Sequence, residues 1–167
     1  QADWGCVILM EVATGEIKAM CNLDRGSDLQ YYEIANHAVV RMEPGSTFKT
    51  IAMMAALDDG KVNIDDTLRV WKDGWYYHGA THRDAHPADT VYTMRQALAV
   101  SSNIALARMI TDGYNGSAKK FVNKLKRMGL CDSIDYIIPG AHQPRINIPK
   151  DTVTISRMAY GYSVELS

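Results

Sequence analysis

Residues 43–57 read Glu43-Pro-Gly-Ser-Thr-Phe-Lys49 and then Thr-Ile-Ala-Met-Met-Ala-Ala-Leu57, a Pro-Gly turn followed by a long apolar run. Proline and glycine stop one element and permit a sharp start of the next. The run predicts a helix from Ser46 to Leu57 that is apolar nearly all round, and such a helix is buried. Asp58-Asp59-Gly60 would end it, because glycine suits the position after a helix C-terminus.

Ser46 and Lys49 carry the chemistry that this helix predicts. Residues three apart on a helix lie on one face, so the Lys49 amine can reach the Ser46 hydroxyl. A serine hydroxyl is a poor nucleophile until a base takes its proton. Burial in an apolar helix would lower the pKa of Lys49, as a general base near neutral pH requires. The backbone N–H of Ser46, in the first turn, is a natural half of an oxyanion hole.

A second polar cluster, Ser101-Ser-Asn103, interrupts two helical patterns downstream. Its serine can relay a proton to a leaving amine, and its asparagine amide can hold an acyl substrate and hydrogen-bond the lysine. Alone, the cluster favours a helix break with capping hydroxyls. Residues 117–120 repeat the serine–lysine spacing and favour a helix cap with an exposed lysine. The two motifs together, in this order, favour an active site.

This pair of motifs resembles the first two motifs of β-lactamases and penicillin-binding proteins. The chain is similar in particular to class B penicillin-binding proteins of the cell-division type, and the resemblance spans essentially all of it. The similar segments are Met10-Glu-Val-Ala-Thr-Gly-Glu-Ile-Lys-Ala19, residues 43–49, Arg83-Asp-Ala-His-Pro87, Ala97-Leu-Ala-Val-Ser-Ser-Asn103 and residues 158–167, which resemble a helix before the third motif.

The resemblance implies an α/β (α+β) fold, in which helices pack on an antiparallel sheet around the Ser46 helix. Residues 1–167 would be a partial transpeptidase domain that contains only the N-terminal hairpin of that sheet. The family's third motif is Lys-Thr/Ser-Gly, and no lysine here is followed by that pair; Lys49-Thr-Ile51 comes nearest. We therefore expect the domain to be incomplete and the fragment to be catalytically impaired.

The function implied by the resemblance is peptidoglycan D,D-transpeptidation through a serine acyl-enzyme. Ser46 would attack the D-Ala-D-Ala carbonyl of a stem peptide, and Lys49 would activate it. Ser101 would pass the proton on, and Asn103 would hold substrate and lysine, with no cofactor or metal. β-Lactams would leave Ser46 acylated. The family also implies a membrane-anchored parent on the periplasmic face of the inner membrane and partners in cell division and cell-wall synthesis.

Three other functions stay open at this stage. A serine β-lactamase would carry Ser-Asp-Asn in place of Ser-Ser-Asn, and Glu165 is the only glutamate after the second motif. A β-lactam sensor domain would keep the acylated serine but signal. A non-catalytic scaffold fragment would carry vestigial motifs.

The composition is that of one globular domain, with 47% hydrophobic and 22% charged residues in 167. The formal net charge is −1, and no basic run supports nucleic-acid binding. The longest strongly apolar stretch, residues 51–57, is too short to cross a bilayer. Because the chain starts at Gln1, we expect it to be a piece of a longer protein.

The N-terminal segment predicts a β-hairpin, with the apolar residues 6–10, a turn at residues 13–16 and alternation over residues 16–21. If Val12 pairs with Ile17, Cys6 and Cys21 share one face, and we expect two half-buried thiols there.

The remaining elements follow from local signals. Residues 22–45 favour irregular structure, 61–92 a long loop with short strands, and 131–153 mostly loop. Helices are expected from Thr93 to Ala99 with a capping box to Gln96, over residues 104–110, from a Ser117 cap to Gly129, and from near Thr154 into the chain end.

Two other clusters favour structure over function. His78, His82 and His86 are spaced like zinc ligands on a helix, but Gly79 and Pro87 argue against a helix there. The aromatic residues Trp71, Trp75, Tyr76 and Tyr77 favour core and loop packing over a glycan or peptide cleft.

Overall fold

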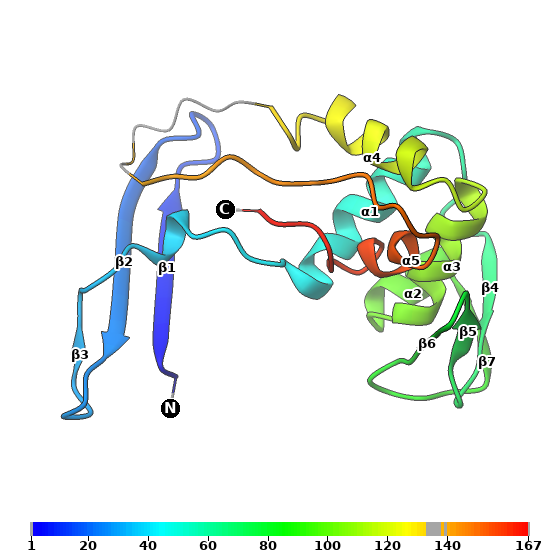
Figure 1. The fold of residues 1–167 in the computed structure, drawn as a ribbon, viewed down its shortest axis with the longest axis horizontal. Helices are drawn as coiled ribbons and strands as arrows, with labels where there is room; N and C mark the ends of the chain where they lie inside the picture. Colours follow the sequence, from blue (N-terminus) through cyan, green and yellow to red (C-terminus); the bar gives the residue numbers. More distant parts are fainter. Residues whose placement is uncertain (1, 133–137, 139, 167) are drawn as a thin grey trace. The chain divides into compact units, whose positions relative to one another are not determined.

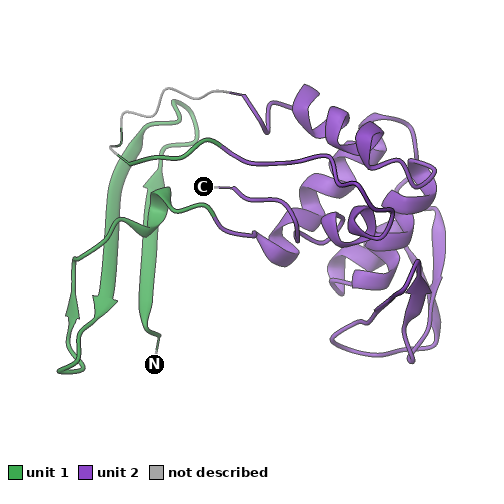
Figure 2. Ribbon diagram, in the orientation of Figure 1, with its two compact units in different colours: residues 1–41, 134–143, 167 green, residues 42–133, 144–166 purple. Residues whose placement is uncertain are grey.

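A computed structural model describes residues 2–132, 138 and 140–166 of the chain. It divides into two compact units (Figure 2). Unit 1 comprises residues 1–41, 134–143 and 167, and unit 2 comprises residues 42–133 and 144–166. The fold is mixed, with small antiparallel sheets and several helices (Figure 1), so the expected α/β class is confirmed.

Unit 1 is built on a three-stranded antiparallel sheet of order β1-β2-β3. Its strands are β1 (Trp4–Met10), β2 (Ile17–Arg25) and β3 (Tyr31–Tyr32). The turn of the β1–β2 hairpin contains Gly15 at a φ of 74°. A short 3-10 helix, η1 (His37–Val39), follows, and the His37 ring stacks on Trp4 at 4.2 Å between ring centroids. The predicted hairpin is confirmed, whereas β3 lies in a stretch expected to be irregular.

The register of this hairpin differs from the expected one. Met10, not Val12, pairs with Ile17, and the register shifts between Leu9 and Met10. Beyond the shift, Cys6 pairs with Asn22 and Val7 with Cys21. Neighbouring strand residues point to opposite faces, so the two cysteines lie on opposite faces of the sheet. The prediction of a shared face is wrong because a bulge changes the pairing by one residue. Both thiols are free, and Cys21 is exposed rather than half-buried.

Unit 2 contains the helices and two two-stranded sheets, β4–β7 and β5–β6. Its elements in chain order are η2 (Gly45–Thr47), α1 (Phe48–Asp58), β4 (Thr67–Val70), β5 (Trp75–Tyr77), β6 (Ala80–His82), β7 (Thr90–Thr93), α2 (Met94–Ala99), α3 (Asn103–Gly113), α4 (Ala118–Arg127) and α5 (Thr154–Met158). The short strands within the predicted 61–92 loop are confirmed. None of the helices in the described part of the chain is long and apolar enough to cross a membrane.

The core of unit 2 forms around α1, which contacts α3 and α4. Most of α1 is buried, as expected, but Thr50 is exposed and Met54 is 53% exposed. The helix therefore buries a broad side rather than its whole circumference. The fully buried large side chains that α1, α3 and α4 contribute are Phe48, Lys49, Ile104, Leu106, Met109, Ile110, Phe121 and Leu125.

Two helix starts obey the local signals in the sequence. The Thr93 hydroxyl accepts the Gln96 N–H, and the Gln96 side chain accepts the Thr93 N–H, which completes the predicted capping box. The Ser117 side chain accepts the Lys120 N–H at the start of α4, while the Lys120 side chain is exposed. Residues 117–120 thus form a helix cap, as predicted.

The last helix is shorter than expected. α5 ends at Met158, and Gly161 then adopts a φ of 89°, which glycine tolerates best. Backbone pairs Met42–Leu166 and Arg145–Glu165 follow in place of helical hydrogen bonds. The predicted helix begins at Thr154 as expected, but residues 159–166 are not helical, so the prediction that it continues into the chain end is wrong. Ser167 lies outside the described residues.

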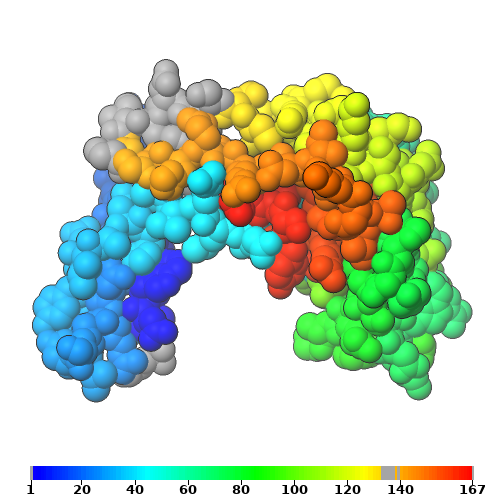
Figure 3. All heavy atoms as spheres, viewed as in Figure 1, coloured from blue at the N-terminus to red at the C-terminus, as the bar shows by residue number. Residues whose placement is uncertain are grey.

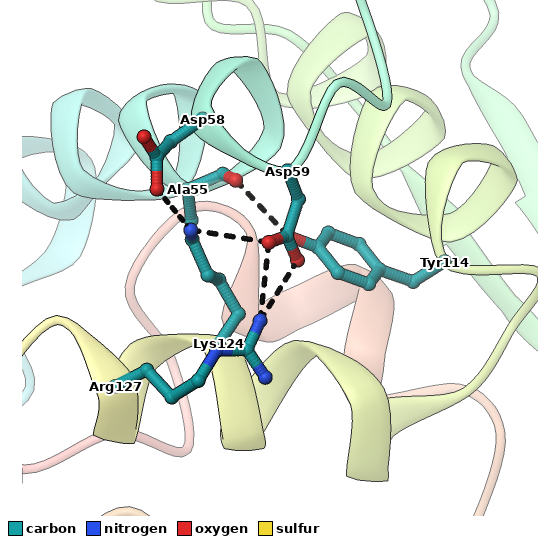
Figure 4. Close-up of polar contacts among 6 residues, drawn as sticks. All are labelled: Ala55, Asp58, Asp59, Tyr114, Lys124 and Arg127. Atoms are coloured by element: carbon teal, nitrogen blue, oxygen red, sulfur yellow. Dashed lines mark hydrogen bonds and ion pairs between the residues drawn. The ribbon is translucent and has the colours of Figure 1, made fainter.

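A charged cluster ties the end of α1 to α4 (Figure 4). The Lys124 amine contacts Asp58 and lies 3.1 Å from Asp59, and Arg127 lies 3.1 Å from Asp59. The buried Tyr114 hydroxyl lies 3.2 Å from both the Asp59 carboxylate and the Ala55 carbonyl. Burial raises the pKa of Asp59, but the hydrogen bonds from Lys124 and Tyr114 outweigh it and hold that pKa below its usual value.

Asp59→Asn is expected to lower the free energy of unfolding by about 1–2 kcal/mol. The substitution removes the negative charge of the carboxylate that Lys124, Arg127 and Tyr114 all contact. Asp58→Asn is the matched control. Its side chain is 74% exposed, so its loss should cost under about 1 kcal/mol. Urea unfolding of the two variants measures the difference, and equal effects would contradict this account of the cluster.

Candidate active site

Ser46 lies in the tight turn that leads into α1. Pro44 has a φ of −72° and Gly45 a φ of +56°, and Ser46 follows as the second residue of η2. The Thr47 hydroxyl donates to the Pro44 carbonyl at 2.7 Å. Ser46 itself is exposed, and within the described residues its hydroxyl forms no hydrogen bond.

The segment after α5 is hydrogen-bonded to the residues just before Ser46. The Gly45 N–H donates to the Gly161 carbonyl at 3.2 Å, and the Glu43 carboxylate accepts the Ser163 N–H at 2.7 Å. Gly161 packs so closely that an added Cβ would lie 2.0 Å from the Gly45 carbonyl oxygen. Sequence reasoning did not find this contact, although a glycine in a predicted helix was a signal against the helix.

Lys49, on the first turn of α1, is buried, with a residue exposure of 1%. Its amine donates to the Ser101 carbonyl at 2.6 Å and lies 2.9 Å from the Ser101 hydroxyl. Burial lowers the pKa of Lys49 to about 8, and the negative charge of Asp84 opposes part of that shift. The structure thus gives the lysine the environment that the apolar helix predicted.

Ser101 lies in the break between α2 and α3. Its φ is +56°, in the left-handed region, and its N–H donates to the Leu98 carbonyl at 3.0 Å. Both the carbonyl and the hydroxyl of Ser101 contact the Lys49 amine. The structure therefore brings Ser101 and Lys49, 52 positions apart in the sequence, into direct contact.

The other two residues of the second motif have different contacts. Ser102 is buried, accepts the Ala105 N–H as the cap of α3, and donates to Asp84 at 2.8 Å. The Asn103 amide donates to the Arg83 carbonyl at 2.8 Å. The hydrogen bond expected between Asn103 and Lys49 is not among those of the described residues, and Ser101 occupies that place beside the lysine.

This arrangement suits a general base. A neutral lysine has two N–H groups and one lone pair. If both N–H groups point at Ser101, the lone pair is left for an incoming proton. A pKa near 8 keeps an appreciable neutral fraction near neutral pH.

The histidines are not brought together as metal ligands in the part of the chain that the structure describes, which contains no group of three or more His, Cys, Asp or Glu residues arranged for a metal. His82 is buried and hydrogen-bonded through both ring nitrogens, to Tyr160 at 2.7 Å and to Ser156 at 3.0 Å. Burial lowers its pKa, which favours the neutral ring. These contacts join β6 to α5, and Figure 3 shows the green and orange-red segments side by side.

The aromatic cluster divides between packing and exposure. Trp75 stacks on Tyr77 at 4.9 Å between ring centroids, and Arg108 lies 5.1 Å from the Trp71 ring centroid. Tyr76 is 70% exposed. Packing against neighbouring side chains therefore accounts for Trp71, Trp75 and Tyr77.

Residues 5–167 match the family described as the penicillin-binding protein transpeptidase domain. This chain belongs to that family. The resemblance read from the two motifs is thereby confirmed, and the match covers both motifs of this transpeptidase domain.

Two relatives illustrate the family. The chain is 26% identical to the probable peptidoglycan D,D-transpeptidase PbpC of Pseudomonas aeruginosa, over 99% of this chain and 30% of that protein. It is 42% identical to the peptidoglycan D,D-transpeptidase FtsI of Buchnera aphidicola, over 41% of this chain and 13% of that protein. The chain thus spans under a third of the length of these relatives.

Solved structures show the same fold. The crystal structure of a peptidoglycan glycosyltransferase from Burkholderia ambifaria matches with a TM-score of 0.81 and 23% identity, over 99% of this chain and 50% of that one. The transpeptidase domain of Burkholderia pseudomallei penicillin-binding protein 3 matches with a TM-score of 0.78 and 21% identity, over 98% and 46% of the two chains.

Proposed function

We propose that this chain is the N-terminal part of a peptidoglycan D,D-transpeptidase domain that works through an acyl-enzyme on Ser46. One observation carries the proposal. The Lys49 amine is buried, has a pKa of about 8 and contacts Ser101, in a chain of this family. A serine three residues before such an amine is the arrangement that serine activation needs.

In the acylation step, the neutral Lys49 amine takes the proton of the Ser46 hydroxyl as its oxygen attacks the D-Ala-D-Ala carbonyl. The tetrahedral intermediate then expels the terminal D-alanine. Its amine receives a proton through the Ser101 hydroxyl, which takes one from the Lys49 ammonium. An ester between Ser46 and the stem peptide remains, and Lys49 is neutral again.

In the second step, an amine from a neighbouring stem peptide attacks the ester. The amine's proton passes back through Ser101 and Lys49 to the Ser46 oxygen, and the new amide is the crosslink. We assign Asn103 to substrate binding, through the side-chain oxygen that its bond to Arg83 leaves available. No step in this scheme requires a metal or a cofactor. A β-lactam would enter by the same attack and leave Ser46 acylated.

We further propose that the chain alone is catalytically impaired or inactive. The sequence has no Lys-Thr/Ser-Gly motif, which in the family supplies an oxyanion donor and substrate contacts. Loss of one oxyanion donor costs about 10²–10³ in rate. The location that suits this activity is the periplasmic face of the inner membrane, in a membrane-anchored parent with cell-division partners.

The competing β-lactamase function requires a glutamate that activates water for deacylation. Glu165 exchanges two backbone hydrogen bonds with Arg145, at 2.8 and 3.0 Å, and its carboxylate lies 3.8 Å from the Arg145 guanidinium. Among the described residues the Glu165 carboxylate has no hydrogen bond or ion pair to Ser46, Lys49 or Ser101, which favours the transpeptidase over the β-lactamase.

Intact-mass measurement after incubation with benzylpenicillin tests the proposal. We expect a slow adduct of one drug mass on the chain and no adduct on Ser46→Ala. The matched control is Ser117→Ala, which removes the serine of the second serine–lysine spacing and should leave the adduct unchanged. An adduct that persists in Ser46→Ala would contradict the assignment of Ser46, and repeated drug turnover would favour the β-lactamase.

A further inference from the structure

The carboxylate of Asp84 lies where the second motif meets the start of α3. One of its oxygens accepts the Ser102 hydroxyl at 2.8 Å, and the other accepts the Ile104 N–H at 2.9 Å. Asp84 comes from the loop between β6 and β7, about 20 residues earlier in the chain. A single carboxylate therefore bonds residues on both sides of Asn103.

These bonds hold a break that is costly to form. Ser101 has a left-handed backbone, which is unfavourable for a residue other than glycine. Ser101 and Ser102 donate their N–H groups back to α2, to the Leu98 and Ala97 carbonyls at 3.0 and 2.9 Å. Asp84 secures the other side of the break, so α2 and Asp84 together fix the backbone of Ser101.

The fixed backbone determines what Lys49 meets. The left-handed conformation lets both the carbonyl and the hydroxyl of Ser101 contact the lysine amine, at 2.6 and 2.9 Å. Any movement of the break would disturb both contacts together. The position of the proposed proton relay thus depends on a residue outside both motifs.

Asp84 also places a negative charge near Lys49. No hydrogen bond joins the two among the described residues, but the Asp84 charge acts on the lysine through space. Ser101, Ser102 and Asn103, which line the same break, are uncharged. Arg83, next to Asp84 in the loop, is exposed.

We propose that Asp84 is a positioning residue for the acylation of Ser46, which holds the 101–103 break against Lys49 and keeps a negative charge beside the lysine amine. This inference rests on the proposed function of Ser46 and Lys49. Asp84 acts through Ser102, the α3 N-terminus and the field at Lys49, without touching the substrate.

Three variants separate the two effects of Asp84. Asp84→Asn removes the charge and preserves most of the shape. We expect the pH midpoint of benzylpenicillin acylation to fall by about 0.5–1 pH unit, since the charge that favours the ammonium is gone. The rate at high pH should also fall, by roughly 10-fold, as the break loosens.

Asp84→Glu keeps the negative charge but carries it on a longer side chain. Its pH midpoint should therefore stay near that of the unaltered chain, while its rate at high pH stays low. Asp89→Asn is the control, because Asp89 is exposed in the same loop and accepts the Lys72 N–H instead.

An NMR titration of the lysine side chains, with Lys49→Met to assign the Lys49 signal, reports the same midpoint without any acylation. The role of Asp84 is overturned if Asp84→Asn and Asp89→Asn have the same pH midpoint for the Lys49 titration and the same acylation rate at high pH. If no variant is acylated but the Lys49 titration moves only in Asp84→Asn, the proposed function fails while the effect of Asp84 on Lys49 stands. Circular dichroism of each variant identifies any that fails to fold, and the Asp84→Glu data then carry the test.

Discussion

Lys49→Met is expected to slow the acylation of Ser46 by about 10³-fold, within the range that removal of a general base produces. Methionine keeps an unbranched apolar side chain in the buried first turn of α1, so the helix should persist. What disappears is the amine that contacts the carbonyl and the hydroxyl of Ser101. The rate of adduct formation with benzylpenicillin, followed by intact mass, measures the effect.

The pH dependence identifies the mechanism behind that loss. Burial lowers the pKa of Lys49 to about 8, so the neutral amine accumulates as pH rises through that value. Acylation of the unaltered chain should therefore rise with pH and reach half its maximum near pH 8. Lys49→Met should show no such rise. The control is Lys120→Met, which alters the exposed lysine of the second serine–lysine spacing and should keep rate and profile. A profile shared by Lys49→Met and the unaltered chain would exclude Lys49 as the base.

The same lysine links activity to stability. The unfolded chain holds the lysine proton up to its ordinary pKa of 10.5, whereas the folded chain loses it near 8. Between these values the unfolded state binds more protons, so this group makes the free energy of unfolding rise with pH. Below about pH 8 the cost of burying the ammonium is fully present. Burial of this lysine thus weakens the fold while it lowers the pKa of the proposed base, a common trade-off at active sites.

The features that sequence reasoning found are those set by neighbours in the chain. Thr93 with Gln96 and the cap at Ser117 need only residues three positions away, and both occur as predicted. The register of the β1–β2 hairpin depends on a bulge that no local pattern showed, so the predicted pairing of Val12 was wrong. A shift of one residue moves side chains to the other face, which separated Cys6 from Cys21.

The candidate site also has a part that close neighbours in the sequence determine and a part that depends on residues far apart in the chain. Spacing alone places Ser46 and Lys49 three residues apart, in the η2 turn and the first turn of α1. The expected hydrogen bond between them is not among those of the described residues, where the Lys49 amine contacts Ser101 instead. Asp84 was missed because its partners, Ser102 and Ile104, lie far along the chain. The sequence signal that includes it is the segment Arg83-Asp-Ala-His-Pro87, which resembles the family but does not show what the carboxylate bonds.

Gly161→Ala is expected to be the most destabilising of the substitutions considered. Gly161 has a φ of 89°, and an added Cβ would lie 2.0 Å from the Gly45 carbonyl oxygen and 2.7 Å from the Gly45 nitrogen. Both atoms are backbone, so no side chain can rotate out of the way. The Gly45–Ser46 turn or the segment after α5 must move, and we expect a loss of about 3 kcal/mol or more in the free energy of unfolding.

Gly60→Ala is the control for this clash. Gly60 has a φ of 60°, but an added Cβ would meet nothing within 4 Å, so only the cost of a left-handed backbone remains, about 1–2 kcal/mol. Urea unfolding compares the two variants. Because Gly45 precedes Ser46, Gly161→Ala should also slow benzylpenicillin acylation by about 10²-fold, whereas Gly60→Ala should not. Equal losses of stability would mean that the close approach of Gly161 to Gly45 does not hold the turn that contains the proposed nucleophile Ser46.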